Sequence, residues 1–207
     1  MVRNTTFPVS NVWQTLVINL NLRPENVLRR AALPEDFFSK RLALSPEDCF
    51  RLWRAMETES GDAMFPLRVI ENLTAKSFNP ALVAALCSDN FMQAMQRIAL
   101  CIKLVCPVEL EVDVNEVGEL KISPQWMMVE MDVPTSLQIA GIAFLLRLAR
   151  IAVREPVKPR QVILPAVPTG AHIRRYGQFF GIAVSQGMSP SITFSALDTS
   201  RQFITAS

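Results

Sequence analysis

Hydrophobic residues in the first half of the chain recur every three or four positions, which is the period of amphipathic helices. The segment 45–48 (Ser-Pro-Glu-Asp) supplies a capping hydroxyl, a first-turn proline and two acidic residues, and therefore predicts a helix start. This helix is expected to bury Phe50 and Trp53 and to end before Gly61. Pro24 in the same way predicts a short helix that continues through Ala31.

Two further helix starts follow the same logic. Asn79 and Pro80 repeat the combination of a cap and a proline, and they predict a helix over residues 81–87. Asn90 and the two residues before it then cap a longer amphipathic helix, whose apolar side carries Phe91, Met95, Ile98 and Ile102.

After Pro107 the hydrophobic residues recur at every second position, which is the period of a β-strand. Valine and leucine alternate with acidic residues from Val108 to Val114, and a turn at Val117-Gly118 predicts a hairpin whose return strand contains Leu120 and Ile122. The expected elements after the hairpin are a third strand over Trp126–Met131, a long helix from Pro134 to about Arg154, a strand over Gln161–Leu164, a helix around His172–Phe180, and strands over Ile182–Ser185 and Ser191–Phe194.

This order of elements predicts the fold class α+β. An N-terminal helical part is followed by a mostly antiparallel sheet, against which a long helix packs. The chain contains no repeat, low-complexity tract or linker that would divide it, so we expect a single domain over residues 1–207.

Composition and charge exclude several classes of protein. The 207 residues are 50% hydrophobic and 19% charged, which excludes disorder as the dominant state, and the net charge of +2 gives no reason to expect strong non-specific binding to nucleic acid. The uncharged stretch 4–22 is rich in asparagine and glutamine amides, and the uncharged run 133–146 is too short to span a bilayer. We therefore expect a cytoplasmic protein without membrane contact.

Few residues are suited to catalysis or to metal binding. His172 is the only histidine, and no nucleophile motif of the G-x-S-x-G type occurs. Its expected role is that of an exposed or helix-capping side chain, although pairing with a cysteine is the alternative on which an enzyme would rest. The four cysteines form no C-x-x-C pair, and we interpret them as free, buried thiols in a reducing compartment. We expect neither an enzyme, nor a cofactor, nor a metal site.

Three arginines of the predicted long helix, Arg147, Arg150 and Arg154, share one face, and Lys158 and Arg160 follow. A basic stripe of this kind can contact phosphates. The favoured interpretation is instead a solvated helix face near the negative C-terminal end of the helix, because no aromatic residues are interleaved with the arginines.

The predicted strand 126–131 offers the best candidate for a ligand site. Trp126, Met128 and Glu130 point to one side of such a strand, and an aromatic ring, a flexible thioether and a carboxylate are suited to line a small-molecule pocket. The alternative is that this side packs under a helix, with Glu130 at the rim.

Four stretches of sequence carry a resemblance to a known family, from about Leu20 to the C-terminus. They are Asn21-Leu22-Arg23-Pro24 through Ala32-Leu33-Pro34; Leu42-Ala43-Leu44-Ser45 through Gly61-Asp62 with Pro66-Leu67-Arg68; Phe78-Asn79-Pro80 through Leu104-Val105-Cys106-Pro107; and Tyr176 with Phe180-Gly181-Ile182-Ala183-Val184, Ile192-Thr193-Phe194, Leu197-Asp198 and Phe203-Ile204-Thr205. The chain resembles the N-terminal effector-sensing domain, of the "arabinose-binding" type, of AraC-family transcription regulators.

The resemblance implies a ligand-sensing and dimerising domain of a DNA-binding regulator. Family members join this domain to a C-terminal helix-turn-helix module, and we expect that module to be absent from these 207 residues, so that promoter DNA is bound only through it. The sequence shows no dense set of sugar-binding side chains, so the expected effector is an unidentified small molecule. The alternative function is a protein-interaction or dimerisation domain without a small ligand.

Overall fold

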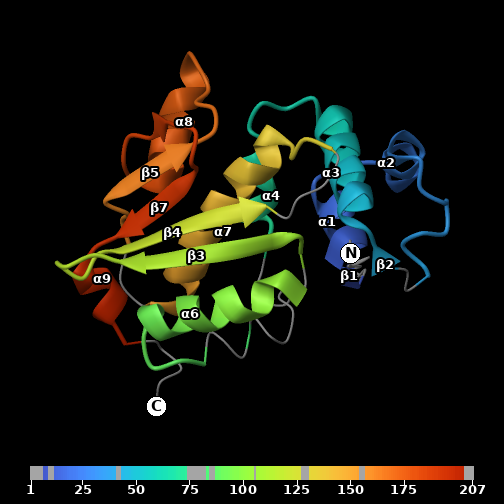
Figure 1. Cartoon of the computed structure of the whole chain (residues 1–207). Helices are drawn as coiled ribbons and strands as arrows, with labels where there is room; N and C mark the ends of the chain where they lie inside the picture. Colours follow the sequence, from blue (N-terminus) through green and yellow to red (C-terminus); the bar gives the residue numbers. More distant parts are fainter. Residues whose placement is uncertain are drawn as a thin grey trace.

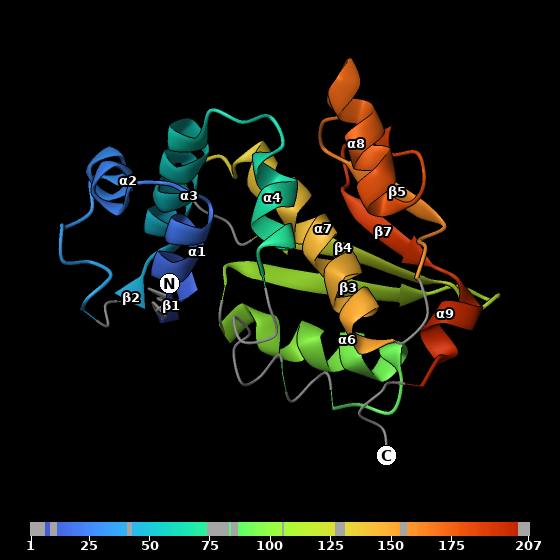
Figure 2. The same ribbon diagram turned by 180° about the vertical axis from the view of Figure 1, so that it is seen from behind.

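A computed structural model of the chain describes residues 7–8, 12–40, 43–73, 83, 87–104, 106–126, 131–153 and 157–202. The N-terminal elements gather at one end of the molecule (Figures 1 and 2). They are, in order, β1 (Phe7–Pro8), α1 (Val12–Asn19), α2 (Pro24–Ala31), β2 (Ala43–Leu44), α3 (Pro46–Ser60) and α4 (Phe65–Glu71). Strands β1 and β2 pair antiparallel and form a small sheet of their own.

Local capping signals set the ends of the N-terminal helices as the sequence predicts. The Ser45 hydroxyl accepts a hydrogen bond from the backbone N–H of Asp48 at 3.1 Å, and α3 ends at Gly61, whose φ of 59° is the left-handed conformation that glycine adopts readily. Helix α2 begins at Pro24 and packs on α3, where the Glu59 carboxylate accepts hydrogen bonds from Asn26 and Arg30 at 2.6 and 2.9 Å. These predictions are confirmed.

The second half of the chain is built on one sheet. Its elements are α6 (Phe91–Cys101), a short 3-10 helix η2 (Ile102–Leu104), β3 (Val108–Val114), β4 (Leu120–Trp126), α7 (Thr135–Ala152), β5 (Gln161–Leu164), α8 (Ala171–Phe180), β6 (Ser185–Gln186), β7 (Ser191–Phe194) and α9 (Ala196–Ser200). Five strands, as far as the structure describes the chain, lie in the order β3-β4-β7-β5-β6, and only the β5–β6 pair is parallel. This mixed α+β architecture confirms the predicted fold class.

Helices α7 and α8 lie on the same face of this sheet, in front of its strands in Figure 2. Helix α6 lies beside β3 in both views (Figures 1 and 2). The Phe91 ring at the start of α6 meets the Phe194 ring of β7 edge to face, with 4.8 Å between the ring centres. One hydrophobic cluster extends from Leu16 in α1 to Phe194, and it includes α3, α4 and α7. The N-terminal helices and the sheet therefore share a common core.

The hairpin is confirmed in detail: Val108 pairs with Trp126 and Val114 with Leu120, so Trp126 belongs to the return strand β4. Residues 127–130 of the predicted third strand lie outside the described residues. The apolar-polar alternation restarts around Pro124, and this break conceals that β4 is continuous. The other neighbour of β4 is β7.

Two other predicted elements differ from the structure. Residues 182–184 do not pair with another strand, and β6 contains only Ser185 and Gln186. The predicted helix over 81–87 lies largely outside the described residues, and so does the predicted end of the long helix at Arg154.

Candidate functional site

Trp126 lies where the sheet meets two helices. Its indole ring meets the Phe50 ring of α3 edge to face at 6.0 Å. Its Cζ2 atom also lies beside Gly141 of α7, 3.7 Å from the position that a Cβ there would occupy, which is an ordinary van der Waals distance. Trp126 thus links β4, α3 and α7. The other two candidate residues, Met128 and Glu130, lie outside the described residues, and their place beside Trp126 stays a prediction.

Helices α3 and α7 are joined by a short chain of hydrogen bonds. The indole N–H of Trp53 donates to the Ser136 hydroxyl at 2.9 Å, and this hydroxyl donates to Oε2 of Glu57 at 2.7 Å. Trp53 and Glu57 are four residues apart on α3 and therefore share a helix face. We call the residues Phe50, Trp53, Glu57, Trp126, Ser136 and Gly141 the α3–α7 seam.

Helix α8 contributes one buried tyrosine, Tyr176. Tyr176 is 2% exposed, and none of the described residues forms a hydrogen bond with its hydroxyl. Burial raises the pKa of Tyr176 to about 12, and the negative charges of Glu57 and Asp62 add to this effect. The phenol therefore stays protonated at neutral pH and can both donate and accept a hydrogen bond.

The nearby Asp62 carboxylate is satisfied by the protein itself. Arg68 donates to its Oδ2 atom at 2.8 Å, and the backbone N–H of Met64 donates to Oδ1 at the same distance. The hydrogen bond from Arg68 is the main reason that the pKa of Asp62 lies below its ordinary value, and the hydrogen bond from Met64 contributes further. Asp62 thus orders the turn between α3 and α4, whereas Glu57 has no cationic partner within the described ranges.

His172 and the cysteines do not form a catalytic arrangement in the described residues. His172 is exposed, as predicted, and no hydrogen bond links it to a thiol or a hydroxyl in that part of the chain. All four cysteines are free, but only Cys49 is buried, while Cys87 is exposed, so the expectation of four buried thiols is wrong. Burial raises the pKa of Cys49 to about 12, which keeps this thiol protonated and unreactive.

The described ranges also contain no group of three side chains suited to hold a metal ion. A search of the same ranges finds no helix that is both long and apolar enough to cross a bilayer.

The predicted solvated arginine face is wrong for Arg147 and Arg150. Both side chains are only partly exposed. Arg150 donates to the carbonyl oxygens of Phe179 at 2.7 Å and of Phe180 at 3.4 Å, and its guanidinium lies 5.8 Å from the centre of the Phe179 ring. It therefore caps the C-terminus of α8, a role that the sequence of α7 cannot reveal. Arg154 lies outside the described residues.

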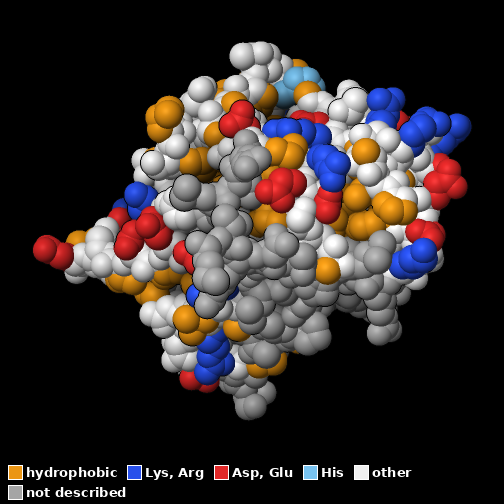
Figure 3. Space-filling view, turned by 45° about the vertical axis from the view of Figure 1, so that its right-hand side comes forward, with side chains coloured by type: hydrophobic (Ala, Val, Ile, Leu, Met, Phe, Trp, Pro, Cys, Tyr) orange, Lys and Arg blue, Asp and Glu red, His pale blue; other side chains and the backbone are white. Residues whose placement is uncertain are grey.

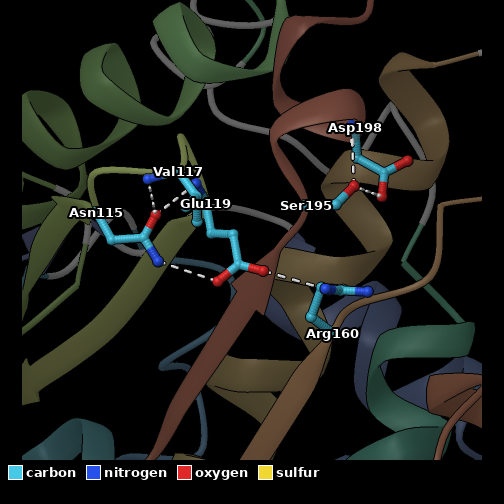
Figure 4. A network of polar contacts seen from close by, with 6 residues as sticks. All are labelled: Asn115, Val117, Glu119, Arg160, Ser195 and Asp198. Carbon is cyan, nitrogen blue, oxygen red and sulfur yellow. Dashed lines mark hydrogen bonds and ion pairs between the residues drawn. The ribbon is translucent and has the colours of Figure 1, made fainter.

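A second polar network holds the tip of the hairpin and has a structural role (Figure 4). Asn115 accepts hydrogen bonds from the backbone N–H groups of Val117 and Glu119, and Arg160 pairs with Glu119 at 3.2 Å. Ser195 caps α9 by accepting a hydrogen bond from the N–H of Asp198 at 3.1 Å. These contacts hold the turn of the hairpin, join it to the residue before β5 and cap α9.

The molecular face that includes the N-terminal helices carries charges of both signs. Asp and Glu side chains lie among Lys and Arg side chains on the upper part of the face drawn in Figure 3, beneath the histidine-coloured patch. The charged side chains drawn on this face are therefore mixed in sign, and the face gives no independent support for contact with phosphates.

Sequence analysis missed Glu57, Ser136 and Tyr176. One signal was available for Glu57, because it lies four residues after Trp53 on the stripe that α3 buries, where a carboxylate is unusual. No signal in the sequence connects Ser136 with Glu57, because this contact spans 79 residues of chain.

The chain matches the family described as the arabinose-binding domain of AraC transcription regulators, N-terminal, over residues 22–203. It belongs to this family and is the effector-binding N-terminal domain of an AraC-type regulator. Because this family is not one of enzymes, the prediction that the chain is not an enzyme is confirmed, and so is the resemblance.

A solved structure supports the same fold. The transcriptional regulator CdpR from Pseudomonas aeruginosa is similar with a TM-score of 0.63 and 16% sequence identity. The alignment covers 96% of this chain and 59% of the CdpR chain, so this chain spans 59% of the length of that regulator. A comparison with curated proteins gives no match.

Proposed function

We propose that the chain senses a small-molecule effector at the α3–α7 seam and transmits its presence to the DNA-binding part of a transcription regulator. The family match over residues 22–203 carries this proposal, because it identifies an effector-binding domain. The seam supports the location, since it joins the N-terminal helices to the sheet through Trp126 and through the hydrogen bonds of Ser136.

The mechanism that we propose is a shift of populations. A ligand that contacts both α3 and α7 favours one arrangement of these helices over another, and it can shift the equilibrium only by its difference in affinity for the two states. DNA contacts are made by a helix-turn-helix module outside these residues, as in the family, and we propose that the regulator works in the cytoplasm as a homodimer. Met128 and Glu130 stay part of the proposed site together with Trp126.

A thermal-shift screen of metabolites tests effector binding. A ligand present at 100 times its dissociation constant stabilises the folded chain by about 2.7 kcal/mol, which such a screen detects. Trp126→Phe is expected to weaken the shift, because it reduces the contact with Gly141. Trp13→Phe is the matched control, since Trp13 is a partly buried tryptophan on α1. The proposal fails if no metabolite raises the melting temperature, or if both variants weaken the shift equally.

Two exposed apolar side chains at the tip of the hairpin favour a second candidate function, that of a dimerisation domain without a small ligand. Val117 and Leu197 are 70% and 68% exposed, and they flank Gly118 and Ala196, which face each other across the contact between hairpin and α9. Exposed apolar side chains that lie together mark interaction surfaces. Light scattering of the Val117→Lys variant tests this surface, because the variant is expected to be monomeric if the tip forms the dimer. A wild-type chain that is already monomeric at high concentration refutes it.

A further inference from the structure

The segment that follows the last strand of the sheet is held by a nearly buried carboxylate. Asp198 of α9 is 8% exposed, and its Oδ2 atom accepts a hydrogen bond from the Ser195 hydroxyl at 2.7 Å (Figure 4). Its Oδ1 atom lies 3.3 Å from Nη1 of Arg201, the first residue after α9. Both oxygens of Asp198 are therefore engaged, and they tie Arg201 to the start of α9.

The next residue is held at a second place. Gln202 forms an isolated antiparallel bridge with Asn90. Asn90 is itself fixed as the cap of α6, because its side chain accepts a hydrogen bond from the N–H of Gln93 at 3.0 Å. Helices α6 and α9 also pack against each other and lie close together in Figures 1 and 2. The chain at Arg201 and Gln202 is thus attached to two helices at once. We call Asn90, Ser195, Asp198, Arg201 and Gln202 the exit joint.

The exit joint is connected to the sheet. The Cβ of Ala196 in α9 lies 3.1 Å from the position that a Cβ on Gly118 would occupy, so α9 lies directly against the hairpin. Phe194, two residues earlier, pairs with Leu120 of β4. Strand β4 ends at Trp126, which belongs to the α3–α7 seam. Rigid elements therefore lead from the seam to the exit joint without a break.

Contacts of this kind restrict the direction of the chain. A flexible linker leaves the domains that it joins free to reorient, whereas a segment attached at two places does not. A nearly buried carboxylate is costly unless partners compensate its charge, so Asp198 disfavours any arrangement in which Ser195 and Arg201 move away from it.

We propose that the exit joint fixes the direction in which the chain continues towards the DNA-binding module, and that Asp198 is its positioning residue. This inference rests on the proposed function, in which that module follows the sensor domain as in the family, and it adds the place where the module is held. A change of packing at the α3–α7 seam then turns the module through β4 and α9, which a flexible tether would not transmit.

Trypsin tests the joint directly, because it cleaves after arginine and the bond between Arg201 and Gln202 lies in the joint. Cleavage requires the segment to open, so its rate follows the population of the open form. The loss of residues 202–207 from the 207-residue chain is measured by mass spectrometry at early times. A synthetic peptide of residues 195–207 is the unprotected reference. We expect the folded chain to be cleaved at this bond at least roughly tenfold more slowly than the peptide.

Three variants test the role of Asp198, and each rate is divided by that of the matching peptide. Asp198→Asn keeps the shape but removes the charge, and it is expected to accelerate cleavage roughly three- to tenfold. Arg201→Lys keeps the positive charge and a trypsin site, so cleavage should stay close to the wild-type rate. Asp113→Asn makes the same charge change at an exposed position of β3, is the matched control and should change nothing.

Hydrogen exchange separates a local joint from general destabilisation. In Asp198→Asn, exchange should become faster in residues 196–202 and stay unchanged in β4, Leu120–Trp126. Arg201→Gln, which breaks the same pair from its other side, should give the same pattern and replaces Asp198→Asn if that variant does not fold. Exchange that rises equally in both segments assigns a merely structural role to Asp198 and overturns the inference.

The remaining outcomes are also decisive. A wild-type chain that is cleaved after Arg201 as fast as the peptide refutes the joint, and so does an Asp198→Asn variant that is cleaved no faster than Asp113→Asn. The metabolite screen does not depend on these contacts. A metabolite that raises the melting temperature of a chain with an open exit leaves effector sensing standing while the joint fails. A closed exit without any metabolite shift supports the joint and counts against the proposed function.

Discussion

Arg147 and Arg150 are predicted to have opposite effects on stability, although they lie three residues apart on α7. Arg150 caps the C-terminus of α8 through the carbonyl oxygens of Phe179 and Phe180 and lies against the Phe179 ring. Arg147 has a fully buried Nε atom with no hydrogen-bond partner in the described residues. The perturbation is replacement of either arginine by methionine, which keeps most of the apolar stem and removes the guanidinium.

The loss of stability expected for Arg150→Met follows from the contacts of the Arg150 guanidinium. The 2.7 Å bond to Phe179 is a charge-assisted hydrogen bond, and such bonds contribute about 1.5–3 kcal/mol when buried and less at a half-exposed site. The guanidinium over the ring adds roughly 0.5–1 kcal/mol, and the favourable position at a helix C-terminus about 0.3–1 kcal/mol. We expect Arg150→Met to lose about 2–3 kcal/mol, which for a domain of this size corresponds to a decrease in melting temperature of roughly 5–10 °C.

Arg147→Met is expected to leave stability unchanged or to raise it by up to about 1 kcal/mol, because it removes a buried donor that has no acceptor. It also removes the positive charge that, after burial, lowers the pKa of Arg150. The assay is urea denaturation followed by tryptophan fluorescence, with thermal unfolding as a second measurement. Equal losses in the two variants, or no loss in Arg150→Met, would refute the assigned role of Arg150.

Three further predictions concern local structure and thiol chemistry. Ser45→Ala removes the cap of α3 and is expected to lower the free energy of unfolding by about 1 kcal/mol in urea denaturation. Gly118→Ala forces an L-residue to a φ of 79° and places its Cβ 3.1 Å from that of Ala196, so we expect a loss of at least about 1–2 kcal/mol. Gly141→Ala, with ordinary helical geometry, is its control and should be neutral or slightly stabilising in the same assay. Because the pKa of Cys49 is raised from 9.0 to about 12, the folded chain keeps a proton that the unfolded chain loses above its ordinary pKa. The free energy of unfolding should therefore fall as pH rises from about 9 towards 12, and the decline should be shallower in Cys49→Ala when unfolding is measured across this range.

Local sequence signals account for the elements whose geometry depends on near neighbours in the chain. The cap at Ser45, the proline at position 24 and the alternation from Val108 to Val114 each predicted an element that the structure contains. These signals work because a capping hydrogen bond or a strand face is decided within a few residues. Errors arose where the signal was interrupted. Pro124 breaks the alternation within β4, and the strand is nevertheless continued by its seven paired positions with β3.

The sequence by itself determined the fold class, the hairpin, the helix starts and the resemblance to AraC-type sensor domains, because periodicity and motifs are written in consecutive residues. Only the tertiary structure decided which side chains meet. It paired Arg150 with the end of α8, placed Trp126 between α3 and α7, and joined Ser136 to Glu57 across 79 residues. Such contacts depend on how helices pack around the common core, so whether a given arginine or glutamate is solvated, capping or open to a ligand follows from that packing and not from local pattern.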